Sequence, residues 1–273
     1  MKKGIDVSYH QKSIDWEKVK ASGIDFAIIR AGYGRTTIDN TFRYNVEECI
    51  RLGIPFGVYW FIYGVNEAEA IKNAEKCYEA IAPYKNHIDL KVWCDLEYDT
   101  DKKANGRGVV LTKNIRTAMV IAFCERMKQY GFEVGNYANP DYLKTKFKDL
   151  SQYPLWLAKY SDTKGDYDCF MWQYTSKGKV DGITGNVDMN YLYVEEDDDD
   201  TVKEVSTYIM PTIKKDSKGK AVQVWQVIVG CDPDGIFGKK TLTATKTFQK
   251  NKGLLVDGIV GKESWKAGLE SLK

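Results

Sequence analysis

Short apolar runs alternate with amphipathic stretches along residues 1–194. Runs such as Phe26-Ala27-Ile28-Ile29 and Phe56-Gly57-Val58-Tyr59-Trp60 are almost wholly apolar, which is typical of parallel strands covered on both faces. Residues near 15–22, 41–52, 66–82 and 111–130 have helical patterns between them. The pattern predicts strands at Lys3–Ser8, Phe26–Tyr33, Pro55–Ile62, Leu90–Glu97, Phe132–Ala138, Leu155–Tyr160, Phe170–Tyr174 and Val187–Tyr193.

The spacing of the last three expected strands affects the fold prediction. After a short helix expected at 142–150, the gaps between strands are about nine and twelve residues, which is marginal or too short for a helical crossover. Strand–helix repetition followed by strands without helices favours an α/β fold built as an irregular (β/α) barrel. An open doubly wound sheet is the alternative.

An acidic run separates this region from a basic tail. Residues 195–204 carry seven acids and one Lys, which predicts a solvated linker over 195–207. Residues 208–273 carry twelve Lys and six acids, a net of +6, and they repeat a glycine-containing turn and helix start at an offset of 23 residues, in Asp234–Thr241 and Asp257–Ser264. We therefore expect a small all-α domain at 208–273 behind a large domain at 1–194. Its charge suggests an anionic partner, which could be nucleic acid, a membrane surface or an acidic cell wall.

Composition and missing motifs exclude several classes of protein. Six cysteines without a CxxC pair and only two histidines argue against a zinc site, and cysteines inside apolar runs are expected to be buried thiols. No run approaches the ~18 apolar residues of a membrane span, and the first residues lack the apolar core of a secretory signal. We expect synthesis in the cytoplasm and neither metal nor cofactor. The chain has no GxSxG, P-loop or GxGxxG motif, which argues against serine hydrolases, NTPases and dinucleotide-binding enzymes.

Two acids on one face of an apolar strand give the clearest chemical signal. Strand alternation puts Asp95 and Glu97 on the face of Trp93, with Cα atoms about 6.6–7 Å apart at a rise of ~3.3 Å per residue. Burying both acids is costly unless they are paired or functional. The spacing suits a carboxyl pair around a glycosidic bond, one protonated and one ionised. The alternative is a structural pair bound by Arg30 or by backbone amides.

Two further acids are expected at the same end of the barrel. Asp6 lies in the first expected strand and Asp188 in the last, each with apolar neighbours that point away. The first and last strands are neighbours in a closed barrel, and the fourth lies across the mouth. Three strands would thus direct carboxylates into one cavity, at the end where barrel enzymes hold their catalytic groups.

Aromatic residues near the strand ends would supply a sugar-binding surface. A sugar packs its C–H faces on aromatic rings, while its hydroxyls need polar groups, and Tyr offers both. Any single ring is as readily explained by core packing, so the argument depends on their gathering at one end of the barrel. Besides Trp172, the expected substrate-binding residues are Arg30, Tyr33, Tyr59, Tyr63, Tyr137 and Trp156.

These motifs, taken in order, resemble glycoside hydrolase family 25. The likeness runs through residues 1–194 and rests on Gly4-Ile5-Asp6-Val7-Ser8-Tyr9-His10-Gln11, Phe26–Gly34, Gly57-Val58-Tyr59-Trp60-Phe61, Asp95-Leu96-Glu97, Leu155-Trp156-Leu157-Ala158 and Val187-Asp188-Met189-Asn190. The resemblance implies a lysozyme that cleaves the β-1,4 bond between N-acetylmuramic acid and N-acetylglucosamine on a (β/α)5β3 barrel. It also implies that Glu97 is the general acid, that Asp95 orients or stabilises the reacting N-acetyl group, and that Asp6 and Asp188 complete the acidic floor.

The tail is similar to the helical peptidoglycan-binding module, in Asp234-Gly235-x-Phe237-Gly238, Phe248-Gln249 and Asp257-Gly258-x-x-Gly261. The implied partners are peptidoglycan and anionic wall polymers, with no nucleic acid and no membrane insertion. A phage endolysin that acts on the wall after release fits this organisation, and a bacterial autolysin would look similar. The rivals are a barrel that binds glycan without cutting it, disfavoured by the presence of both Asp95 and Glu97, and a chitinase-like hydrolase, whose longer acidic strand motif is missing.

Overall fold

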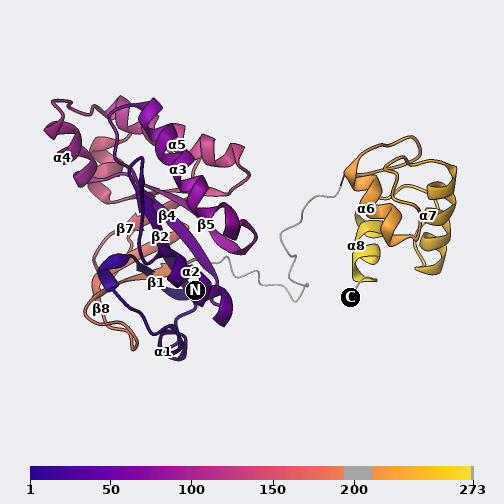
Figure 1. Ribbon diagram of the computed structural model, residues 1–273, viewed down its shortest axis with the longest axis horizontal. Coiled ribbons are helices and arrows are strands. Elements are labelled where there is room, and N and C mark those ends of the chain that lie inside the picture. The colour runs from indigo at the N-terminus through magenta and orange to yellow at the C-terminus, as the bar shows by residue number, and fades with distance from the viewer. Residues whose placement is uncertain (194–210, 272–273) are drawn as a thin grey trace. The chain divides into compact units, whose positions relative to one another are not determined.

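The computed structural model describes residues 1–193 and 211–271. The chain divides near residue 196 into two compact units, and each is described by itself (Figure 1). The expected acidic linker at 195–207 lies outside the described residues.

Nine strands form the sheet of the first unit. They are β1 (Lys2–Val7), β2 (Phe26–Tyr33), β3 (Thr37–Ile38), β4 (Phe56–Phe61), β5 (Ile88–Asp95), β6 (Val134–Ala138), β7 (Leu155–Ala158), β8 (Met171–Gly178) and β9 (Val187–Leu192). β1 pairs with both β2 and β9, so the sheet closes into a barrel of eight strands, with the short β3 added to the edge of β2. The closure excludes the open doubly wound alternative.

Helices connect the earlier barrel strands and are absent between the last ones. α1 (Trp16–Ala21) follows β1, α2 (Phe42–Leu52) precedes β4, α3 (Glu67–Ile81) precedes β5, and α4 (Tyr98–Gly106) and α5 (Lys113–Gln129) lie between β5 and β6. Short 3-10 turns occupy Tyr9–Gln11 and Ala82–His87. A single π-helical turn, Tyr142–Lys146, joins β6 to β7, and the described chain from β7 to β9 has no helix. The expected (β/α)5β3 arrangement is confirmed, and Figure 1 shows α3 and α5 side by side against the strands.

The first unit has one apolar core outside the barrel and another inside it. Alternate strand residues such as Val92, Cys94 and Leu96 pack outward against the helices. The inward set is smaller and rich in large rings, including Phe26, Trp93 and Trp156. Inward glycines make room for these rings: a Cβ on Gly135 would lie 2.2 Å from the Trp93 ring. The floor of the barrel is therefore a packed layer of rings, and a substrate can reach only the side chains at the rim.

Some elements differ from the sequence-based expectation. β3 and α4 were not predicted, because β3 has two residues and α4 buries only Thr100 and Ala104, which gives no apolar periodicity. The expected helix at 142–150 is only a five-residue π turn. The expected strand at Leu90–Glu97 ends at Asp95.

The second unit is a three-helix module with an internal repeat. α6 (Lys220–Ile228), α7 (Lys239–Asn251) and α8 (Lys262–Glu270) enclose a core around Trp225 and Phe237. In each of the two repeats, a buried glutamine side chain donates a hydrogen bond to the aspartate of the glycine-containing turn. Gln226 Nε2 donates to Asp234 Oδ1 at 2.8 Å, and Gln249 Nε2 donates to Asp257 Oδ1 at 2.9 Å. The repeat read from the sequence therefore has a structural basis.

Candidate active site

The barrel brings its acidic residues to one rim. Asp6 is the last residue but one of β1, and Asp95 ends the parallel strand β5. β9 runs antiparallel, so Asp188, its second residue, lies at the same rim, where it pairs in register with Asp6. The structure thus brings together carboxylates from three strands, as the alternation pattern predicted.

Glu97 extends this cluster from just beyond β5. It is the N-cap residue of α4, and its φ of −146° and ψ of −164° keep the backbone extended, so strand alternation continues for two residues past the strand. Burial raises the pKa of Glu97 to about 7, with further contributions from the charges of Asp99 and Asp188. A carboxyl group with this pKa is partly protonated at neutral pH and can act as a proton donor.

Asp95 is a buried carboxyl group with an uncommitted oxygen. Its side chain is 5% exposed, and its Oδ1 has no hydrogen-bond partner among the described residues. Burial, and then the charges of Glu97 and Asp6, raise its pKa well above the usual range, while Arg30 lowers it. A buried polar atom without a partner is costly, so Oδ1 is available to a ligand in the cavity.

Asp6 is held by two amide side chains that the sequence analysis did not single out. Its Oδ2 accepts hydrogen bonds from Gln173 Nε2 and Asn190 Nδ2, each at 2.8 Å. Gln173 Oε1 in turn accepts from the hydroxyls of Tyr137 and Tyr160, each at 3.0 Å. Burial and the charge of Asp188 still raise the pKa of Asp6 well above its usual value. The pKa of Asp188 is raised to about 6, chiefly by burial.

The expected aromatic surface divides into rings of the floor and rings of the rim. Tyr59 and Tyr137 pack edge-on against Trp156 inside the barrel, with centroid distances of 5.9 and 4.7 Å. Trp156 is only 1% exposed and its indole N–H donates to Asn190, so it belongs to the floor. Trp172 packs in a separate cluster with the outward-facing Leu157. Contact of these two rings with a sugar stays a prediction.

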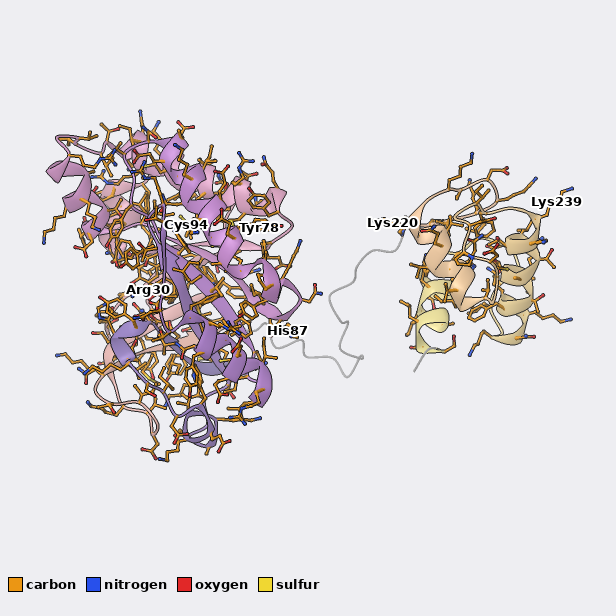
Figure 2. The ribbon with its side chains drawn as sticks, viewed as in Figure 1. Arg30, Tyr78, His87, Cys94, Lys220 and Lys239 are labelled. Atoms are coloured by element: carbon orange, nitrogen blue, oxygen red, sulfur yellow. The ribbon has the colours of Figure 1, made fainter. Side chains whose placement is uncertain are left out.

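Arg30 pairs with Asp39 and not with Asp95 or Glu97. Its Nε donates to Asp39 Oδ2 at 2.8 Å, and its guanidinium lies over the rings of Tyr9 and Tyr33. Arg30, labelled in Figure 2, is 8% exposed. The Asp95–Glu97 pair is therefore not a structural ion pair with Arg30, and no cation of the described residues forms a salt bridge with the acid cluster.

Tyr33 and Tyr63 lie at the rim, where they meet edge-on with centroids 5.9 Å apart. Both line a cavity of about 610 Å³ that continues from the rim towards α3 and α4. The half-exposed Tyr160 also belongs to the rim, since burial and the charges of Asp188, Asp6 and Glu97 all raise its pKa. Rings thus stand beside the acid cluster, as glycan binding requires.

A rim of carboxyl groups with raised pKa values, flanked by tyrosines, is suited to cutting a glycosidic bond. The family model described as glycosyl hydrolases family 25 matches residues 5–183. The chain belongs to glycosyl hydrolase family 25. It is therefore a glycoside hydrolase of the lysozyme type. A second model, described as a peptidoglycan binding domain, matches residues 221–267.

Individual relatives of this family 25 chain include autolysins and an endolysin. It is 28% identical over 265 residues to the autolytic lysozyme of Clostridium acetobutylicum, covering 95% of this chain and 76% of that protein. The modular autolysin LytC from Streptococcus pneumoniae, solved with a synthetic peptidoglycan ligand, gives a TM-score of 0.63 at 29% identity over 70% of this chain and 46% of that one. The CTP1L endolysin gives a TM-score of 0.58 at 25% identity over 71% and 67% of the two chains. The family 25 chain thus spans less than half the length of the pneumococcal protein.

Two site residues missed from the sequence carried a signal. Gln173 lies in the expected strand 170–174, and Asn190 lies two residues after Asp188, so each has the parity of an inward position. An amide at an inward position of a barrel strand needs a partner, and the nearby acids are the obvious ones. Tyr160 ends the expected strand 155–160 with the parity of Trp156, so it carried the same signal.

The described residues lack two kinds of feature. No group of three or more His, Cys, Asp or Glu side chains is arranged to hold a metal ion. None of the helices in this part of the chain is long and apolar enough to cross a bilayer.

Proposed function

We propose that this family 25 hydrolase cuts the β-1,4 bond between N-acetylmuramic acid and N-acetylglucosamine in bacterial peptidoglycan. The observation that carries the proposal is the pKa of Glu97, raised to about 7 at the barrel rim beside a buried second carboxyl group. The similarity to a protein named an autolytic lysozyme adds support.

Each acid has a chemical role in this proposal. Glu97 donates its proton to the glycosidic oxygen, and the bond from that oxygen to C1 of muramic acid breaks. A water molecule then adds its oxygen to C1 and gives up a proton to a carboxylate of the cluster, from which Glu97 is reprotonated. Asp95 orients the reacting N-acetyl group, for which its uncommitted Oδ1 is available. Asp6 and Asp188 complete this group of acids at the rim, and in their ionised forms they stabilise positive charge developing on the sugar ring.

The reaction is tested by Glu97→Gln and by the identity of the product. The variant should lose at least ~10²-fold in wall lysis, because Gln cannot donate the proton. Glu47→Gln, a change of the same kind on an exposed face of α2, should keep full activity. New reducing ends should be N-acetylmuramic acid. Released peptide stems, or reducing ends only at N-acetylglucosamine, would show that the chain cuts another bond.

We further propose that the second unit retains the enzyme on the wall. Its match to a peptidoglycan binding domain and its net charge of +6 over 208–273 support binding to peptidoglycan and to anionic wall polymers. A chain ending near Val194 should cut soluble glycan strands but bind whole walls more weakly. High salt should weaken the binding of the full chain, since charges are screened beyond roughly 8–10 Å near physiological ionic strength. If the shortened chain clears whole cells as fast as the full chain, the tail does not target the enzyme.

For the biological role we propose a phage endolysin that reaches the wall from the cytoplasm and lyses the host. Similarity to the CTP1L endolysin supports it, whereas similarity to the clostridial autolytic lysozyme favours an autolysin. Expression inside a bacterium with a susceptible wall separates the two roles. Lysis only after the membrane is permeabilised fits an endolysin, and lysis without that treatment fits an autolysin.

A further inference from the structure

Most of the charged side chains that line the cavity of about 610 Å³ beside the acid cluster are cations. The cavity lies between the loop after Tyr33, α3 and α4. Its lining holds five basic side chains against two acidic ones, and the basic ones are Arg35, Lys72, Lys76, Lys103 and Arg107. This sign is opposite to that of the neighbouring acid cluster, so the two regions are suited to different parts of one ligand.

Three of these cations already have partners. Arg107 makes a bidentate pair with Glu69 at 2.6 and 2.7 Å, and Arg35 lies 3.6 Å from the same carboxylate. Lys76 pairs with Glu79 at 2.7 Å.

The other two cations have no carboxylate partner among the described residues. Within the described part of the chain, neither Lys72 nor Lys103 has a carboxylate within salt-bridge distance. Both are exposed side chains on the wall of the cavity. A ligand can therefore bind these two cations without breaking an existing salt bridge.

Lys103 connects this cavity to the reacting centre. Its Nζ lies 3.6 Å from the ring centroid of Tyr63, over the face of the ring. It also follows Asp99 by four residues on α4, about one helical turn, and the charge of Asp99 acts on Glu97. Lys103 is therefore the cation of this cavity that contacts Tyr63, on the helix whose N-cap is Glu97.

We propose that this cavity is a specificity subsite for the carboxylates of the peptide stem on muramic acid, with Lys103 and Lys72 as its cationic contacts. The inference rests on the proposed function. Unsubstituted glycan of N-acetylated sugars is neutral, whereas the lactyl group of muramic acid carries a short peptide with free carboxylates beside the bond to be cut. A lysine ammonium on a flexible stem suits carboxylates that are themselves mobile.

The test compares soluble peptidoglycan chains with the same chains after carbodiimide amidation, which keeps the stems but removes their charge. For the wild-type enzyme, amidation should raise KM about threefold to tenfold and leave kcat nearly unchanged, because two exposed ion pairs are lost. The double variant Lys72→Gln, Lys103→Gln should show the higher KM on native chains and no further effect of amidation. Lys102→Gln makes the same charge change next to Lys103 on α4, outside the cavity lining, and should behave like the wild type.

Several outcomes would overturn the subsite. One is a double variant that still prefers unamidated chains, and another is a fall in kcat with KM unchanged. A third is inhibition by soluble polyglycerol phosphate that depends on Lys72 and Lys103 without any effect of amidation, which would assign the cavity to a phosphate polymer. Analysis of the reducing ends separates these from failure of the proposed function. If the wild type releases muramic acid ends while the lysine variants keep the preference, only the subsite is wrong.

Discussion

Glu97→Gln should make the protein more stable at neutral pH while it removes catalysis. Burial raises the pKa of Glu97 from its ordinary 4.5 to about 7. The folded chain therefore holds more protons than the unfolded chain between pH 4.5 and 7, and the free energy of unfolding decreases as the pH rises through that window. Gln keeps the shape of the side chain and cannot ionise, so the free energy of unfolding of the variant does not decrease in this way as the pH rises.

The size of the effect follows from the pKa shift. From 4.5 to about 7, at 1.36 kcal/mol per pKa unit, the upper bound is about 3 kcal/mol at pH 8. The neighbouring carboxyl groups titrate together with Glu97 and share this energy, so we expect a gain of roughly 1–3 kcal/mol. For a unit of this size, that corresponds to a rise in Tm of roughly 2–10 °C at pH 8, and to no rise near pH 4.

Thermal unfolding of the full chain at pH 4, 6 and 8 measures this dependence. Glu47→Gln is the control, since its carboxylate is half exposed in a surface pair with Arg43, and it should change stability by less than about 0.5 kcal/mol at each pH. A gain for Glu97→Gln of equal size at pH 4 and pH 8 would refute the reasoning, because the gain would then come from packing. Absence of any gain at pH 8 would show that Glu97 is better solvated than its surroundings indicate.

Three further predictions concern the pH–rate profile, the hydrogen bond from Gln173 to Asp6, and the buried ring of Trp156. The rate of wall lysis should decrease as the pH rises above about 7, where Glu97 loses its proton, which a pH–rate profile with a soluble substrate checks. Gln173→Leu removes a hydrogen bond that lowers the pKa of Asp6, so kcat should fall about tenfold and the acidic limb of the profile should move to higher pH. Trp156→Phe should cost about 1–3 kcal/mol in chemical denaturation, because it leaves a cavity and an unsatisfied amide below the site.

The acid cluster could be predicted from the sequence because strand alternation is a local rule. Asp6, Asp95 and Asp188 each lie in an apolar run whose parity gives their direction, and barrel closure then brings them to one rim. The spacing of the expected strands and helices favoured the barrel that closure requires, and the family resemblance implied the same fold. Glu97 was expected inside the strand, but it lies two residues beyond it, and its inward direction survives because the backbone stays extended.

Depth in the barrel could not be predicted from alternation. Parity indicates that Trp156 points inward, but not that it lies deep enough to be covered by other rings and left 1% exposed. The cations of the proposed subsite could not be predicted from the sequence either. Lys103 lies on α4, a helix without apolar periodicity, and Lys72 lies on α3, so only the tertiary fold places them on one cavity.

The absence of a cation in the acid cluster depends on Asp39, which can be tested. The Asp39 side chain is fully buried, holds Arg30 at 2.8 Å and also accepts from the backbone N–H of Thr41. Arg30 lowers the pKa of Asp95 even while it is paired. In Asp39→Asn the field of Arg30 on Asp95 is no longer offset, so the pKa of Asp95 should fall.

The acidic limb of the pH–rate profile should accordingly move to lower pH in Asp39→Asn. The variant should also lose about 3–5 kcal/mol of stability, because a buried cation remains without its carboxylate. Asp39→Glu keeps the negative charge beside Arg30, so the acidic limb of its pH–rate profile should stay at the wild-type pH even if the side chain packs less well. A folded Asp39→Asn enzyme with the wild-type pH profile would show that Arg30 is kept from the acid cluster by the rings of Tyr9 and Tyr33 and not by Asp39.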